Sequence, residues 1–308
     1  MIKIPYHYNV SRWKWYVDYI MKKMCYPDTQ KNPATDFFSR QTRKFLCQIT
    51  KNADVMTDIL LLPETELLKK YPRIKFYYHM SSRGNSKKFR RFNDEVKLWF
   101  NYEKINKMTR WKIFKLMDVK VCPYCNRQYI HIVEDSGYLG DIDHFLNKDI
   151  YPLFSLSIWN MIPCCKPCNQ KYKRSSTTTI LSPHDEGFDD DCIIKVKPHN
   201  VGALLGENND MDLKWEIDIN TPQEKSKKIL ENIKLFQLNE QYKNHIEDVK
   251  DILRWKRLYN HNYLKYLKKL LNINEHQFNR MIFGCTLKPD NFKDELLSKM
   301  VYDIVKHE

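Results

Sequence analysis

The chain has 308 residues, of which 42% are hydrophobic and 13% aromatic, so we expect a folded protein of two or three units and exclude an intrinsically disordered chain. It has no run of eighteen apolar residues and begins without the apolar segment of a signal peptide, so we expect a cytoplasmic protein without a membrane span. The net charge of +14 is divided as +15 over residues 1–120, −3 over 121–190 and +2 over 191–308. The acidic centre suits a divalent cation, and the basic segment before it suits a polyanionic ligand.

Residues 1–115 predict a basic, mainly helical domain that binds nucleic acid or a partner. Amphipathic patterns indicate helices over residues 11–25, 36–50 and 63–71. The inward-facing residues of one more helix, which starts at Asn93 or Asp94, are Val96, Trp99, Phe100 and Met108.

Residues 73–92 mix basic and aromatic side chains. Basic side chains contact phosphates and aromatic rings stack on bases, so we favour a nucleic-acid surface here. The alternative is a buried aromatic core with a solvated charged rim. Phosphate contacts carry no sequence information, so no recognition sequence is inferred. The cations assigned to this surface are Arg83, Lys87, Lys88, Arg90 and Arg91.

Residues 116–190 form the segment that carries the chemical motifs. Residues 127–133 alternate as a strand does, and residues 138–144 return as the second strand of a hairpin. Proline is favoured in a first helical turn, so a helix is expected to open at Lys166-Pro167. The predicted order is hairpin, loop, helix.

Residues 191–308 predict a second hairpin followed by a helical domain. Its strands are expected at 192–197 and 213–219. The segment Thr221-Pro222-Gln-Glu224 matches a capping box at a helix start. The apolar residues that share one face of the second strand are Leu213, Trp215, Ile217 and Ile219.

Nine cysteines are present, and five of them fall within residues 122–168. An odd number concentrated in one segment argues against a disulfide framework and for a metal site in a reducing compartment. Two Cys-x-x-Cys turns are the usual source of four thiolates for a structural zinc ion, which staples a fold but performs no reaction. Cys164 competes with Cys165, although its spacing to Cys168 is less usual. The expected zinc ligands are Cys122, Cys125, Cys165 and Cys168.

Residues suited to phosphodiester hydrolysis stand between and just after these cysteine pairs. Such hydrolysis needs a base that activates water and a cation that holds the phosphate. His144 titrates near working pH and can be the base, while Asp143 and Asn169 can offer oxygen ligands to Mg²⁺ or Mn²⁺. Asp141 shares a strand face with Asp143, so either carboxylate can be the ligand. Asn160 can hydrogen-bond the loop that holds His144.

These blocks resemble a known family. Asp143-His144, Asn160 and Cys165-x-x-Cys168-Asn169 look like the three blocks of HNH endonucleases, the zinc-stapled branch of the ββα-metal (His-Me finger) nucleases. The resemblance implies a central zinc-stapled ββα-metal (HNH) core. Together with the helical patterns on either side, the expected fold is α+β, mostly α-helical, with this core flanked by helical regions. The resemblance also implies the family's activity, metal-dependent endonuclease cleavage of DNA.

The resemblance further implies a role for each matched residue. His144 would be the general base, Asp143 a metal ligand and Asn160 an orienting residue, and Asn169 stands where the family has its last, metal-binding histidine. The family's spacing after Asn160 decides for Cys165 as a zinc ligand. Because asparagine replaces that last histidine, the preferred catalytic metal stays open.

The stretches Cys-Pro-Tyr-Cys-Asn-Arg, Asp-Ile-Asp-His-Phe, Ile-Tyr-Pro-Leu and Asn-Met-Ile-Pro-Cys-Cys resemble the HNH nuclease subunit of Septu and retron-associated anti-phage defence systems of bacteria. This resemblance implies a partner subunit, an ATPase of the ABC/SMC type. Cleavage of both strands would need a dimer or two events. Two other functions stay open: a non-catalytic zinc-ribbon nucleic-acid binder, and an HNH nuclease directed at RNA or tRNA. Lys171 and Lys173 are further candidates for phosphate contacts.

Overall fold

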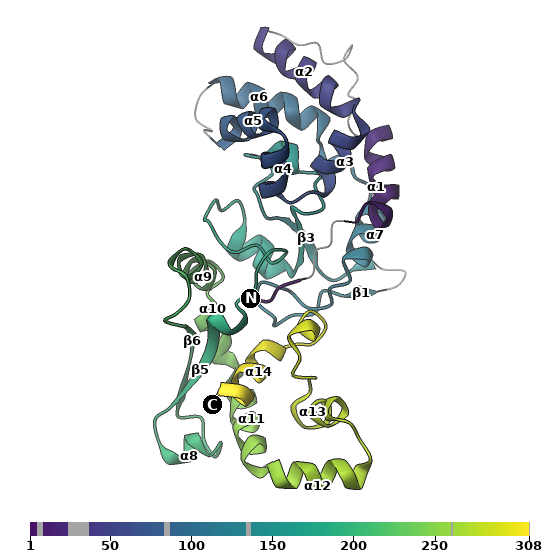
Figure 1. Ribbon diagram of the computed structural model, residues 1–308. Coiled ribbons are helices and arrows are strands. Elements are labelled where there is room, and N and C mark those ends of the chain that lie inside the picture. The colour runs from purple at the N-terminus through teal and green to yellow at the C-terminus, as the bar shows by residue number, and fades with distance from the viewer. Residues whose placement is uncertain (5–8, 24–36, 83–86, 134–136, 260, 308) are drawn as a thin grey trace.

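Helices make up most of the described chain. The computed structural model describes residues 1–4, 9–23, 37–82, 87–133, 137–259 and 261–307. Within these ranges the strands form three two-stranded antiparallel sheets, and no helix is both long and apolar enough to cross a membrane. The predicted class, α+β with helices predominating, is therefore confirmed. Figure 1 places the N-terminal helices at one end of the molecule, the C-terminal helices at the other, and strand β3 between them.

The regular secondary structure described in the N-terminal part is helical. Asparagine caps start two of its helices: Asn52 accepts hydrogen bonds from two N–H groups of α3, and Asn106 accepts one from α7. Helices α2 and α6 pack together, and an ion pair from Arg43 to Glu95, 2.5 Å between Nε and Oε2, links them. The helices are α1 (Val10–Lys23), α2 (Phe37–Thr50), α3 (Ala53–Leu61), α4 (Glu64–Lys70), α5 (Pro72–Ser82), α6 (Lys87–Trp99) and α7 (Lys107–Met117).

Two details of the N-terminal prediction differ from the structure. Helix α6 begins at Lys87, well before the expected start, because good helix formers precede Asn93. Met108 is not an inward-facing residue of this helix: it lies in the first turn of α7 and is 71% exposed. The other expected core residues, Val96, Trp99 and Phe100, are buried. The predicted ends at residues 24, 25 and 36 lie outside the described residues.

The central hairpin differs from the expected one. The predicted strand over residues 127–133 is reduced to β1 (Ile132–Val133), which pairs with β2 (Gly137–Tyr138). Strand β3 (Asp141–His144) pairs instead with β4 (Met161–Cys164). Strand β1 is short because the backbone of residues 122–130 forms the first cysteine turn, in which the N–H of Cys122 donates to Gln128 O at 2.9 Å.

The C-terminal part combines one hairpin with helices. Strands β5 (Cys192–Pro198) and β6 (Met211–Ile217) are antiparallel, with Cys192 opposite Ile217. The expected inward face of the second strand is right for Leu213 and Trp215, but Ile219 lies beyond the strand and is 96% exposed. The helices are α8 (Val201–Leu204), α9 (Gln223–Leu235), α10 (Leu238–Tyr242), α11 (Ile246–Leu258), α12 (His261–Leu271), α13 (Glu275–Phe283) and α14 (Ser298–His307).

The predicted capping box before α9 is not formed. Pro222 occupies the N-cap position, without a side-chain cap hydrogen bond. The hydroxyl of Thr221 instead donates to the carbonyl oxygen of Asp191, at 3.2 Å. The threonine therefore ties the helix start to the beginning of β5 rather than to its own first turn.

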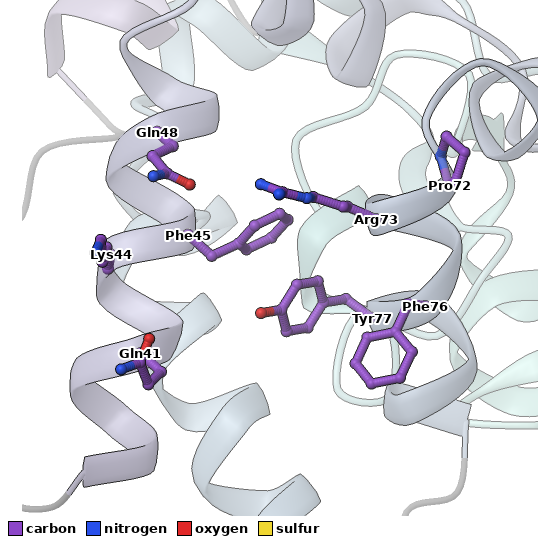
Figure 2. A pocket seen from close by; sticks show the side chains of 8 residues that line it. All are labelled: Gln41, Lys44, Phe45, Gln48, Pro72, Arg73, Phe76 and Tyr77. Carbon is purple, nitrogen blue, oxygen red and sulfur yellow. The ribbon is translucent and has the colours of Figure 1, made fainter.

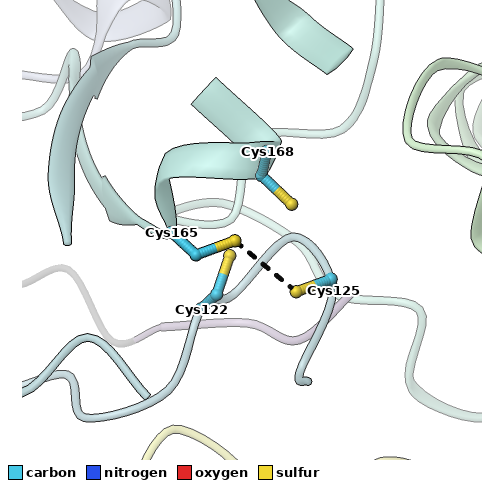
Figure 3. Close-up of side chains that lie close together, drawn as sticks. All are labelled: Cys122, Cys125, Cys165 and Cys168. Carbon is cyan, nitrogen blue, oxygen red and sulfur yellow. Dashed lines mark hydrogen bonds between the residues drawn. The ribbon is translucent and has the colours of Figure 1, made fainter. Parts of the chain in front are cut away.

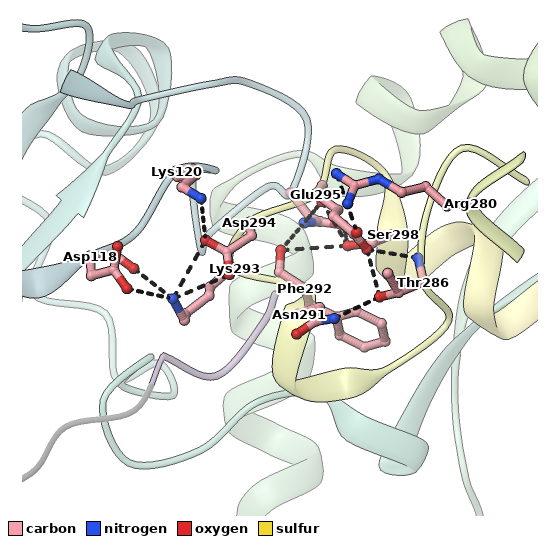
Figure 4. A network of polar contacts seen from close by, with 11 residues as sticks. Asp118, Lys120, Arg280, Thr286, Asn291, Phe292, Lys293, Asp294, Glu295 and Ser298 are labelled. Atoms are coloured by element: carbon pink, nitrogen blue, oxygen red, sulfur yellow. Dashed lines mark hydrogen bonds and ion pairs between the residues drawn. The ribbon is translucent and has the colours of Figure 1, made fainter. Parts of the chain in front are cut away.

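Residues 292–293, near the C-terminus, contact the first cysteine turn through hydrogen bonds and an ion pair. Figure 4 shows this polar network, in which Lys293 Nζ lies 3.1 Å from an oxygen of Asp118. The backbone N–H groups of Lys120 and Val121 both donate to Lys293 O, at 2.9 and 3.0 Å. The side chain of Asn126, in the cysteine turn, donates to Phe292 O at 3.0 Å. The cysteine turn is thus held from both ends of the sequence, because Ile2 N also donates to Pro123 O.

Candidate metal and catalytic site

Four buried cysteines meet where two distant segments touch. Cys122 and Cys125 lie on the turn after α7, Cys165 follows β4, and Cys168 lies in the short helical segment Pro167–Lys173 (Figure 3). Their sulfur atoms all lie within 4.8 Å of one another, and Cys125 Sγ lies 3.9 Å from Cys165 Sγ. A tetrahedral zinc ion with Zn–S bonds of about 2.3 Å places its sulfurs about 3.8 Å apart, so the cluster fits a structural metal ion such as zinc.

The structure selects among the neighbouring cysteines as predicted. Cys164 ends β4 opposite Asp141 and does not belong to the cluster. Burial raises the pKa of both Cys122 and Cys164, whereas hydrogen bonds from Cys122 and the other cluster thiols lower that of Cys125. A metal ion binds the thiolate form, so loading this cluster would release protons.

Strand β3 carries three of the predicted site residues, and β4 pairs with it. Side chains alternate along a strand, so Asp141 and Asp143 share one face of β3, and His144 faces the other way. Gly140, just before β3, allows the close approach of the two strands, because a Cβ there would lie 2.6 Å from Cys164 O. Because Cys165 directly follows β4, the hairpin leads into the cysteine cluster.

His144 is buried, and its environment fixes one tautomer. Its Nε2 lies 2.9 Å from Ser155 O, and since a carbonyl only accepts, Nε2 carries the proton and Nδ1 keeps a lone pair. Burial lowers the pKa of His144 to about 4, so the ring is neutral at pH 7. The ring of Tyr102 meets it edge to face, with centroids 4.5 Å apart. His144 is therefore held as a neutral imidazole whose Nδ1 can accept a proton.

Asn160 holds the backbone on both sides of this contact. It is fully buried, and its Oδ1 accepts from Leu146 N at 2.6 Å. Its Nδ2 donates to Leu146 O and to Phe154 O, both at 3.1 Å. Leu146 lies two residues after His144, and Phe154 directly precedes Ser155. One amide therefore joins the loop after the histidine to the segment that supplies its carbonyl partner.

Asp143 is engaged by protein groups. Tyr124 donates its hydroxyl to Asp143 Oδ2 at 2.7 Å, and Lys173 Nζ lies 3.0 Å from Oδ1. Lys173 also donates to His144 O at 2.7 Å, and both side chains of the ion pair are 4% exposed. Lys173 is therefore not a surface contact for phosphate, contrary to expectation, because its ammonium is buried against this carboxylate.

Asp141 is the carboxylate that lies beside Asn169. Asn169 Nδ2 lies 3.2 Å from Asp141 Oδ2, and Gln170 Nε2 lies 2.7 Å from the same oxygen. A half-turn of the Asn169 amide would present its oxygen instead, because the amide nitrogen and oxygen are nearly the same size. One carboxylate and one amide oxygen fit a hard cation such as Mg²⁺, which keeps several waters.

Two cations lie beside the ring of Tyr102, which packs against the histidine, and the sequence offered no signal for them. The guanidinium carbon of Arg110, in α7, lies 4.6 Å from the ring centroid of Tyr102, and Lys148 Nζ lies 5.5 Å from it. Burial raises the pKa of Tyr102, and the nearby charges of Glu103 and Asp141 act in the same direction. Glu103 pairs with Arg110 and with Lys148. Tyr102 thus lies among His144, both cations and Asp141.

Only three of the other predicted nucleic-acid contacts have described side chains. Arg83 lies outside the described residues, as do the side chains of Lys87 and Lys88. Arg90 and Arg91 are exposed on α6. Lys171 is exposed beside the ring of Tyr172, with its Nζ 5.3 Å from the ring centroid.

No protein-family model matches the chain. No curated protein and no solved structure matches it either.

Proposed function

We propose that this chain is a metal-dependent HNH endonuclease that hydrolyses phosphodiester bonds of DNA. The observation that carries the proposal is the His144–Ser155 contact, which leaves Nδ1 of a neutral imidazole as the proton acceptor. The hairpin β3–β4 followed by the helical segment Pro167–Lys173 supports a ββα-metal core. The cysteine cluster would staple that core with zinc.

The chemistry would divide among a base, two phosphate-binding cations and the residues that hold a metal ion. His144 Nδ1 takes a proton from water, the resulting hydroxide attacks phosphorus, and the bond to the departing sugar oxygen breaks. Arg110 and Lys148 would bind the phosphate oxygens, and the phosphate would replace Glu103 as their ion-pair partner. Asp141 and Asn169 would hold the catalytic Mg²⁺ or Mn²⁺. When bound, that cation would supply positive charge for the phosphate and the leaving oxygen.

The two carboxylates of β3 differ in their suitability as ligands of the catalytic cation. The ammonium of Lys173 already neutralises Asp143 and would repel a second cation beside it. Asp141 instead faces an amide that can turn an oxygen toward it. We therefore propose Asp141 as the metal ligand and Asp143 as the residue that anchors Lys173 beneath the histidine.

The test is cleavage of DNA by the zinc-loaded protein with Mg²⁺ or Mn²⁺. His144→Ala is expected to lose cleavage while its circular dichroism and zinc content stay those of the parent. His131→Ala, at a half-buried histidine beside Tyr129, is the matched control and should cleave normally. Cleavage by His144→Ala would overturn the base assignment, and cleavage of RNA or tRNA alone would change the substrate class.

One observation favours a second function, a zinc-ribbon nucleic-acid binder without catalysis. The carboxylate that HNH enzymes would use as ligand, Asp143, is occupied by Lys173. A binder would retard DNA in a gel yet cleave neither DNA nor RNA with any divalent cation, with or without a partner.

We further propose that the nuclease serves bacterial anti-phage defence beside an ABC/SMC-type ATPase. The motif resemblance around Cys122, His144 and Cys165 is what supports this role. Co-purification of the chain with the product of a neighbouring ATPase gene would test it, and the absence of any such gene would oppose it.

A further inference from the structure

A basic and aromatic cleft lies between α2 and α5, in the N-terminal part of the molecule. It has a volume of about 450 Å³, within the range of pockets that hold small molecules. The residues that line it are Gln41, Lys44, Phe45, Gln48, Pro72, Arg73, Phe76 and Tyr77, and no acidic side chain is among them. The cleft therefore offers positive charge and flat apolar surface together.

Each helix contributes one face to the cleft. Gln41, Lys44 and Gln48 follow helical spacing on α2, and Arg73 and Phe76 do so on α5. Figure 2 shows Arg73 extending across the gap toward the side of Gln48. Among the described residues, no hydrogen bond or ion pair within the protein engages the side chains of Lys44 and Arg73. Both cations are exposed to meet a ligand.

Stacked rings form one wall. Phe45 and Tyr77 stack with centroids 4.0 Å apart, and Tyr77 stacks on Phe92 at 4.9 Å. Phe76 meets Tyr77 edge to face, and its own side chain is 60% exposed. A large aromatic ring left in water is costly, and a face so exposed can receive another flat ring.

The charge of the two helices identifies the ligand class. α2 and α5 carry five Lys and Arg residues and no Asp or Glu. An exposed ring suits a base, exposed cations suit the phosphates on either side of it, and glutamine amides suit its polar edges. We propose that this cleft binds an unpaired nucleotide of a DNA strand, with the base against Phe76 and the flanking phosphates at Lys44 and Arg73.

A paired base presents no free face, so the cleft would favour single strands over duplex. The inference rests on the proposed function in taking DNA as the ligand. It adds that the preferred substrate carries an unpaired segment at a distance from the scissile phosphate. Binding and cleavage are measured separately, so failure of one proposal is distinguished from failure of the other.

The test compares binding of fluorescent single-stranded and duplex DNA of one sequence by the full chain in a His144→Ala background. Phe76→Ala is expected to weaken single-strand binding about tenfold, the effect of losing one stacked base. Arg73→Ala and Lys44→Ala should each lower the slope of log affinity against log salt by about 0.7. Duplex binding should change much less.

Two matched controls share the chemistry but lie outside the cleft. Tyr266, on α12, is 61% exposed, so Tyr266→Ala removes an aromatic ring as open as Phe76. Lys75→Ala removes an exposed cation from α5 itself. Both should bind single strands as the parent does.

Unchanged single-strand affinity in Phe76→Ala and Arg73→Ala, or an equal loss for duplex DNA, would overturn the inference. If the cleft variants weaken single-strand binding but the parent cleaves no nucleic acid, the inference stands and the proposed nuclease function fails. If the parent cleaves DNA but the cleft variants bind single strands normally, the nuclease function stands and the inference fails.

Discussion

The Nε2 atom of His144 lies 2.9 Å from the carbonyl oxygen of Ser155, eleven residues further along the chain. Because the partner is a backbone group, no substitution of the Ser155 side chain removes it. The geometry depends instead on the path of the chain between the two residues. Asn160 holds both ends of that path, through Leu146 and Phe154.

Asn160→Ala should therefore impair catalysis without touching the reacting atoms. Truncation leaves backbone groups of Leu146 and Phe154 without partners in the interior, and we expect a stability loss of about 2–4 kcal/mol. Turnover should fall with little change in KM, since the base is misplaced while the phosphate contacts remain. Urea unfolding and steady-state kinetics measure the two effects. Asn160→Asp keeps the acceptor for Leu146 N but turns a buried oxygen toward the carbonyls of Leu146 and Phe154, so it should not recover the loss. Parent-like turnover in either variant would contradict this role.

The cysteine cluster is tested by a pair of neighbouring substitutions. Cys125→Ser removes a ligand, and because structural zinc contributes about 10–16 kcal/mol, more than most domains have in net stability, the central segment should unfold. Cys164→Ser removes a buried thiol outside the cluster and should keep one zinc per chain. Metal analysis by mass spectrometry checks both. Zinc loss in Cys164→Ser with retention in Cys125→Ser would reverse the ligand assignment.

The two carboxylates of β3 can be separated by cation affinity. Asp141→Asn is expected to weaken Mn²⁺ binding at least about tenfold, because the charged ligand is lost. Lys173→Met leaves Asp143 buried and unpaired, which should cost about 3–5 kcal/mol of stability without improving Mn²⁺ affinity. Titration calorimetry of the zinc-loaded protein measures the affinities. Tighter Mn²⁺ binding in Lys173→Met would assign the ligand role to Asp143.

Stability should depend on pH through buried histidines. Burial lowers the pKa of His184 from 6.5 to about 4, and its Nε2 lies 2.9 Å from Met161 O. Between these values the unfolded chain binds a proton that the folded chain does not, so stability falls as pH drops from about 6.5 to 4. Each such group contributes up to about 1.4 kcal/mol per pH unit.

His184→Gln removes the pH-dependent contribution of this histidine to stability, and the glutamine amide can still donate a hydrogen bond to Met161 O. The difference in unfolding free energy between parent and variant should therefore shrink as the pH is lowered from 7 to 4, measured by urea titration at each pH. A difference that stays constant with pH would contradict the assignment.

The local patterns predicted helices α1, α2 and α4 because the side chains that face a helix core lie a few residues apart. Helix α7 was not predicted as a separate helix, although its cap is local: Asn106 accepts a hydrogen bond from the N–H of Thr109, three positions away. The central hairpin was mispredicted because β3 pairs with β4, which lies beyond a loop of sixteen residues, and alternation along one strand does not name its partner. Lys173 was mistaken for a surface cation for a similar reason: its burial depends on Asp143, thirty positions earlier.

The amino-acid sequence alone determined which four cysteines form the cluster, because two Cys-x-x-Cys turns supply thiolates at a spacing that few other structures use. It also pointed to His144 as the candidate base. Only the tertiary structure decided which carboxylate lies beside Asn169, which cations surround Tyr102 and that α2 and α5 form a cleft without acidic residues. Those relationships join side chains from separate elements, and their distances are set by packing rather than by position along the chain.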